Sequence, residues 1–124
     1  MNNFQERVRR WGMHTFGLVV MRDRRERGFR FCEESLELVQ AIGLSKEDVI
    51  KLVDYVYGRP IGNIKEEIGG VGTTLASVCT AHDIDMEDCF DNELDLKCWP
   101  NSAKIKAKHA SKKNKSSSLP GGAD

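Results

Sequence analysis

Carboxylate side chains at helical spacing are the residues of this sequence best suited to chemistry. Two predicted helices carry them, one over residues 29–42 and one over residues 63–81. At about 100° per residue, those of the first helix fall within roughly a 100° arc, and those of the second share a face with Asn63 and Gly70. The carboxylates concerned are Glu33, Glu34, Glu37, Glu66 and Glu67.

Clustered carboxylates repel one another unless something neutralises them. A hard divalent cation such as Mg²⁺ takes oxygen ligands and keeps waters that substrate phosphates displace, so two acidic helix faces are one way to build a magnesium site. A solvated face is the alternative. Arg30 and Lys65 are nearby partners for it, and each exposed ion pair would contribute about 0.5 kcal/mol. Spacing alone favours the solvated face.

Gly and Pro residues divide the chain into segments with helical periodicity. The pattern predicts helices over about 4–16, 29–42, 46–57, 63–81 and 86–96, with a separate basic stretch at 22–30. Gly43 is a suitable C-terminal cap, and Ser45 with Asp48 resembles a capping box. No strand-like alternation of useful length occurs, so the predicted fold class is all-α.

The composition describes one domain with an acidic body and a basic tail. The 124 residues, 40% of them hydrophobic, can bury one modest core. The net charge of zero is a cancellation, because seven Lys residues between Lys97 and Lys115 offset an acidic excess elsewhere. We expect a helical domain over residues 1–98 and a basic, largely disordered tail over 99–124. Such a tail would fold back on the body, reach an anion such as nucleic acid, or stay solvated.

Several classes of protein are not expected. No apolar stretch approaches the roughly 18 residues of a membrane span, and Arg residues interrupt the N-terminal segment where a secretory signal needs an apolar run. The cysteines are widely spaced without a CxxC pair, which indicates reduced thiols rather than a zinc site or disulfides. These cysteines are Cys32, Cys79, Cys89 and Cys98. We therefore expect a cytoplasmic protein with no membrane partner.

Two stretches of the sequence resemble the MazG-like, all-α nucleoside triphosphate pyrophosphohydrolases. They are RFCEESLELVQAIG and, after a further helix, KEEIGGVGTTLASVC. The family signature is EExxE on one helix and ExxD on the next but one. Glu33, Glu34 and Glu37 match its first half, and Glu67 begins the second half, but Gly70 stands where the family has Asp. Most of the chain is similar to small stand-alone members from bacteria and their phages.

The resemblance implies a MazG-like helical bundle that forms a homodimer or homotetramer. It implies cleavage of the α–β phosphate bond of a (d)NTP, or of a related pyrophosphate ester, to give a monophosphate and pyrophosphate. Mg²⁺ is the implied cofactor, with Mn²⁺ as a substitute. The implied metal ligands are Glu34, Glu37 and Glu67, with Glu66 as a further candidate, and Glu33 would orient the attacking water or support the ligands from outside.

Cationic residues that would hold the substrate phosphates are also candidates. Arg30 lies beside the acidic motif, and Lys104 and Lys108 follow the last predicted body helix, a region that often supplies cations in the family. Guanidinium and ammonium groups are the usual partners of phosphate oxygens.

Gly70 leaves the function open between two hypotheses. Loss of one carboxylate weakens a divalent site, although Glu66, Asn63 or water would fill the position. The first hypothesis is an active pyrophosphohydrolase, and the alternative is a catalytically weak or inactive nucleotide- or partner-binding module. A nucleic-acid-associated protein that uses its Lys tail is a third, less favoured hypothesis. The glycines at 69–72 are not a phosphate loop, since no Lys-Ser/Thr follows them, and we expect them to allow close helix packing.

Overall fold

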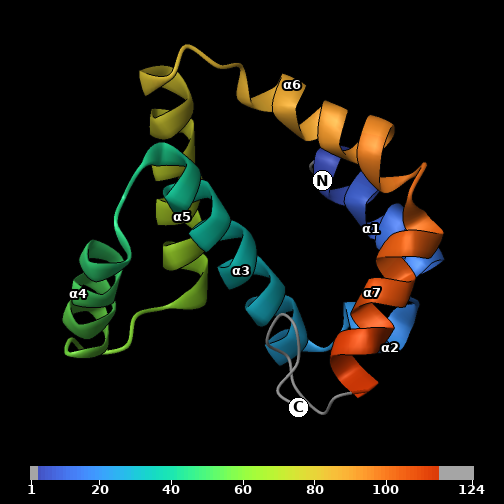
Figure 1. Ribbon diagram of the computed structural model, residues 1–124, viewed down its shortest axis with the longest axis horizontal. Coiled ribbons are helices and arrows are strands. Elements are labelled where there is room, and N and C mark those ends of the chain that lie inside the picture. The colour runs from blue at the N-terminus through green and yellow to red at the C-terminus, as the bar shows by residue number, and fades with distance from the viewer. Residues whose placement is uncertain (1–2, 115–124) are drawn as a thin grey trace. The chain divides into compact units, whose positions relative to one another are not determined.

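The computed structural model describes residues 3–114, with side chains to residue 111, as helices joined by short turns (Figure 1). The chain divides into a first unit, residues 1–33 with 87–124, and a second unit, residues 34–86. In order, the helices are α1 (Asn3–Thr15), α2 (Leu18–Met21), α3 (Arg24–Ile42), α4 (Lys46–Tyr57), α5 (Ile64–Ala81), α6 (Met86–Asp91), the π-helix η1 (Asn92–Cys98) and α7 (Ser102–Asn114). Residues 3–114 contain no strand, which confirms the all-α prediction for that range. Within the same range, no helix has both the length and the apolar character required to cross a bilayer.

The ends of α3, α4 and α5 follow from local chemistry that the sequence displays. Gly43 adopts φ 108°, the left-handed conformation that ends α3. The Ser45 side chain accepts a hydrogen bond from the Asp48 backbone N–H at 3.1 Å, which caps α4. Asn63 caps α5 in the same way by accepting from the Lys65 N–H at 2.9 Å. These caps place the acidic residues of α5 in its first turn.

Three features differ from the predicted helices. Helix α3 begins at Arg24 and absorbs most of the basic stretch, because Asp23 accepts a hydrogen bond from the Glu26 N–H at 3.0 Å at its start. Gly17 adopts φ 85° and separates α1 from the short α2, which the sequence did not predict. Beyond α6 the chain widens into η1, where the Trp99 N–H donates to the Leu94 carbonyl five residues earlier at 3.1 Å.

Helix α1 organises the first unit, because α2 and α7 both pack against it. The Met21 side chain occupies the space where a Cβ on Gly12 would lie, so a larger residue at this position would displace the end of that side chain. At the other end of α1, Arg7 forms ion pairs with Asp91 at 2.7 Å and Asp95 at 2.9 Å. These contacts connect α1 to α6 and η1.

Residues 102–114 form helix α7, which differs from the predicted disordered tail beginning at residue 99. The Trp11 Nε1–H donates to Ser102 Oγ at 3.0 Å, and His109 is only 8% exposed. The segment is rich in Lys, which led to the prediction of disorder, but these few contacts on its buried side hold it against the rest of the unit. The remainder of the predicted tail, residues 115–124, lies outside the described residues.

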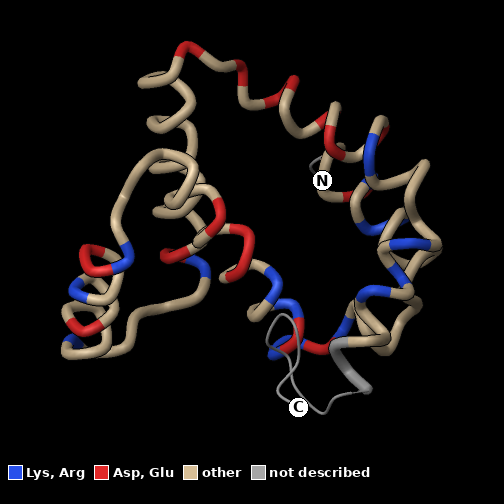
Figure 2. The backbone as a smooth tube through the Cα atoms, viewed as in Figure 1, with Lys and Arg blue, Asp and Glu red and all other residues tan. Residues whose placement is uncertain are grey.

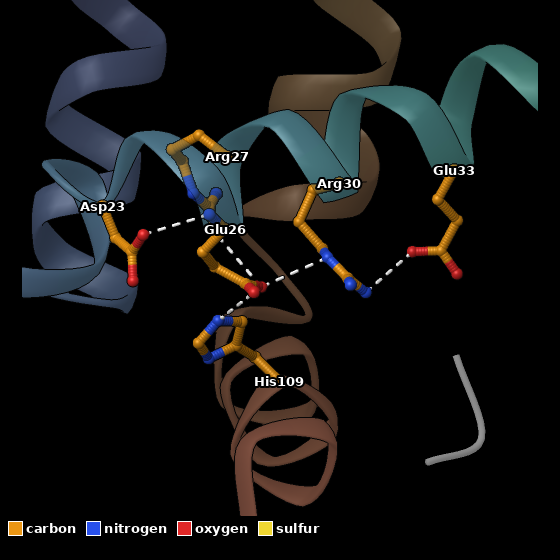
Figure 3. A network of polar contacts seen from close by, with 6 residues as sticks. All are labelled: Asp23, Glu26, Arg27, Arg30, Glu33 and His109. Carbon is orange, nitrogen blue, oxygen red and sulfur yellow. Dashed lines mark hydrogen bonds and ion pairs between the residues drawn. The ribbon is translucent and has the colours of Figure 1, made fainter. Parts of the chain in front are cut away.

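A buried polar network joins α7 to the start of α3 (Figure 3). Glu26, 4% exposed, lies with its Oε1 3.0 Å from His109 Nε2 and 3.2 Å from Arg30 Nε. Arg27 adds its guanidinium 5.2 Å from the centroid of the Phe16 ring. Burial lowers the pKa of Arg27, and the Glu26 carboxylate opposes that shift. The Glu26 carboxylate is therefore hydrogen-bonded to the His109 ring on α7 and lies within ion-pair distance of Arg27 and Arg30 on its own helix.

The second unit has no buried residue of its own. All residues from 34 to 86 are exposed or half-buried. Of the nineteen exposed large hydrophobic side chains in the described part of the chain, fourteen belong to this unit. Ile64 and Ile68 on α5 are 78% and 66% exposed. So many exposed large apolar side chains in one unit are typical of an association surface.

We expect His109→Ala to lower the free energy of unfolding by about 1–3 kcal/mol, because it removes a buried hydrogen bond to a carboxylate. Urea denaturation followed by circular dichroism, at fixed protein concentration, measures this change. Ser111→Ala, an exposed substitution on the same helix, is the control and should change stability by less than about 0.5 kcal/mol. Equal midpoints for the two variants would show that the His109–Glu26 contact does not stabilise the fold.

Candidate functional site

The acidic motif of α3 is divided between the two units. Glu33 belongs to the first unit, where Arg30 Nη1 donates to its Oε1 at 2.9 Å. Glu34 and Glu37 belong to the second unit and are exposed. This contact confirms, for Glu33, the alternative in which Arg30 is its ion-pair partner.

Glu66 and Glu67 lie in the first turn of α5, where the positive end of the helix dipole favours carboxylates. The Glu67 carboxylate turns back toward the preceding loop, and its Oε2 occupies the space where a Cβ on Gly62 would lie. Glu66 is exposed beside it. The absence of a side chain at Gly62 therefore leaves space for the Glu67 carboxylate.

The predicted ligands are not gathered around one point. Among the residues that the structure describes, no three His, Cys, Asp or Glu side chains are grouped so that they could hold a metal ion. Glu37, Glu66 and Glu67 also form no ion pair with any described residue, and the same is true of Lys65. The described carboxylates of a single chain therefore do not form a complete divalent site, but three of them carry uncompensated charge.

Gly70 lies in open space on α5. A Cβ at this position would have no heavy atom within 4 Å, and the same holds for Gly69 and Gly72. Close helix packing at these glycines, which we expected, does not occur among the residues that the structure describes. The Gly70 carbonyl accepts a hydrogen bond from Thr74 Oγ1 at 2.9 Å. An aspartate side chain would fit here without displacing a neighbour.

The predicted phosphate-binding cations belong to the first unit. Arg30 is 16% exposed in its side chain and engages both Glu26 and Glu33. Lys104 and Lys108 are exposed on α7 and form no ion pair within the described residues. Of the three, Lys104 and Lys108 have ammonium groups available to an anionic ligand.

The Glu26–His109 pair is a buried polar contact that sequence reasoning did not find. The two residues lie 83 positions apart, and no spacing rule connects them. His109 stood in a Lys-rich segment with no other feature of a folded helix. A partial indication in the sequence was Glu26, an acidic residue within the basic stretch at 22–30. If that stretch were buried, the Glu26 carboxylate would need a partner.

Comparison with known proteins returned no match. No family model matches the chain, no curated protein is similar to it, and no solved structure matches it. The resemblance to MazG-like proteins therefore rests on the two acidic motifs and their flanking residues.

We expect Gly62→Ala to move the Glu67 carboxylate, because the added methyl group takes the space of Glu67 Oε2. The side-chain carboxyl ¹³C chemical shift of Glu67 measures the displacement. Gly69→Ala is the matched control, since its methyl group meets nothing; it should leave Glu67 unchanged and stabilise α5 by up to about 1 kcal/mol. An unchanged Glu67 signal in Gly62→Ala would contradict the described position.

Proposed function

We propose that this chain is a MazG-like nucleotide pyrophosphohydrolase that hydrolyses the α–β phosphate bond of a nucleoside triphosphate or a related pyrophosphate ester. The observation that supports the proposal most is the uncompensated charge of the second unit. Glu37, Glu66 and Glu67 are exposed and have no cationic partner among the described side chains. Carboxylates that pair with no Lys or Arg remain available to a cation that arrives with the substrate.

In this proposal Glu34, Glu37 and Glu67 bind the cation, with Glu66 as a further ligand. Mg²⁺, or Mn²⁺ in its place, would neutralise the negative charge of the phosphates when bound. Because the carboxylates in the described part of one chain do not converge on such an ion, we assign no reaction step to it. The ion pair with Arg30 fixes the orientation of Glu33, whose proposed role is to position the attacking water.

A second copy of the chain is the proposed partner that completes the site. The apolar faces of α4 and α5 are exposed, with Val53 at 47%, Val56 at 46% and Ile68 at 66%. Burying them would provide the hydrophobic core that the second unit lacks. The same association would bring carboxylates of two copies together, where one copy offers too few. Both a homodimer and a homotetramer satisfy this requirement.

A nucleotide-binding module without catalysis is the second candidate, favoured by one residue. Gly70 provides no side-chain oxygen where the resembling family has a carboxylate. The open space around Gly70 means that nothing else in the described chain fills that position.

We expect metal-dependent pyrophosphate release from at least one canonical or modified (d)NTP, and we expect Glu37→Gln to reduce it at least about 100-fold. That loss corresponds to about 2.7 kcal/mol of transition-state stabilisation. The measurement is pyrophosphate release with Mg²⁺ or Mn²⁺, with product identity checked by chromatography. Glu47→Gln, an exposed carboxylate on α4 of the same unit, is the control and should retain full activity.

Gly70→Asp is the second variant in this assay, and it should raise the rate at low metal concentration by restoring an oxygen ligand. Release of orthophosphate instead of pyrophosphate would contradict the assigned bond. Nucleotide binding without turnover in both the wild type and Gly70→Asp would favour the non-catalytic module.

We expect analytical ultracentrifugation to show a dimer or tetramer that Ile64→Glu/Ile68→Glu dissociates. The dissociation constant should rise at least about 100-fold, because each buried Ile side chain contributes about 1.5–3 kcal/mol. Thr73→Glu, which adds a charge on the opposite side of α5, is the control and should leave the assembly intact. A monomeric wild type at assay concentrations would remove the second copy from the proposal.

A further inference from the structure

We propose that the first unit binds the phosphate backbone of a nucleic acid through a basic surface on the α2–α3 junction and α7. The basic surface consists of Arg22, Arg24, Arg25, Lys104, Lys106 and Lys108. This inference is separate from the proposed hydrolase, whose carboxylate ligands lie in the second unit.

Charge is segregated between the two units. The first unit contains fifteen Lys and Arg residues against ten Asp and Glu, and the second contains four against nine. A chain with zero net charge is thus a unit of +5 joined to a unit of −5. The electrostatic field of a surface depends on its local charge, so the first unit attracts anions although the whole chain is neutral. Figure 2 shows this excess as Lys and Arg along α1, α7 and the start of α3.

Ion pairing divides the cations of the first unit whose side chains are described into two sets of six. Arg7, Arg9 and Arg10 pair with acidic residues, as do Arg27, Arg30 and Lys97. The six residues of the basic surface are exposed and form no ion pair with the described part of the chain. Among the side chains that the structure describes in the first unit, the unpaired positive charge is therefore concentrated in these six residues.

The Glu26–His109 contact brings the two halves of the basic surface to the same part of the unit. Arg24 and Arg25 directly precede Glu26 in α3, and Lys108 directly precedes His109 in α7. The contact between Glu26 and His109 (Figure 3) is 3.0 Å long and buried, so it joins the two helix segments that carry these cations. Cations spread along two adjoining helices suit a chain of phosphates better than a single small anion.

The composition of α7 favours a nucleic acid over a membrane. The exposed positions of α7 carry Lys, Ala and Ser, and its large apolar residue, Ile105, is half-buried against the unit. A helix that lies on a membrane inserts large apolar side chains opposite its basic face, and α7 does not display them. Lys and Arg that contact phosphates carry no base readout, so we expect binding to be independent of sequence.

The test is fluorescence anisotropy of a short labelled DNA duplex titrated with the full chain in EDTA, between about 50 and 200 mM salt. Six phosphate contacts would give a log–log salt slope of about −5, at about −0.9 for each contact. Lys104→Gln/Lys106→Gln/Lys108→Gln should reduce the slope to about −3 and weaken binding at least about tenfold at the lowest salt. The EDTA removes any metal-dependent binding at the carboxylates, so failure of the hydrolase proposal does not affect this result.

Lys46→Gln/Lys51→Gln/Lys65→Gln is the matched control, because it removes three exposed Lys residues from the second unit and the same total charge. It should leave the slope and the affinity close to those of the wild type. Three results would overturn the proposal: equal weakening in both triple variants, no duplex binding at the lowest salt, or binding by the wild type to anionic phospholipid vesicles but not to the duplex. The vesicle result would assign the surface, with the exposed Leu18 and Val19 of α2, to a membrane.

Discussion

The buried carboxylate of Glu26 is the interaction on which the first unit depends. It accepts from His109 of α7, and it lies within ion-pair distance of two arginines of its own helix. A buried charge is costly unless its hydrogen-bonding capacity is satisfied, so the position of α7 and the conformation of Arg30 are both constrained by one side chain. Arg30 then fixes Glu33, which carries the same constraint along α3 to the edge of the acidic motif.

The second unit has no buried core to hold its helices together. Its helices have well-formed caps and regular periodicity, yet none of its residues is buried. Most of the stability of a helix in a protein comes from tertiary packing of its apolar face, so the unit requires apolar cover from another surface. Its uncompensated carboxylates and its uncovered apolar faces therefore have one common explanation in the proposed second copy.

Local chemistry made much of the fold predictable. The bounds of α4 and α5 follow from Ser45, Asn63 and the Gly and Pro residues near them, because caps act within one turn. Helix α7 was not predicted because it is stabilised by contacts with Trp11 and Glu26, which are distant in sequence, and not by its own composition. The acidic residues were found from spacing, but spacing could not reveal that they do not converge in one chain, since that depends on tertiary arrangement.

The π-helix η1 sets the direction in which the residues directly after it continue. Its wider turn buries both Leu94 and Cys98, four residues apart, and delivers Ser102 to Trp11. Removal of one residue from this segment would restore a regular α-helix and rotate its last residues by about 100°. The turn at residues 99–101 would then start from a different direction, and Ser102 would lose its position beside Trp11. The length of η1 therefore sets the position of Ser102 relative to Trp11. Homologous chains in which α7 packs in the same way should keep that length even where its residues change.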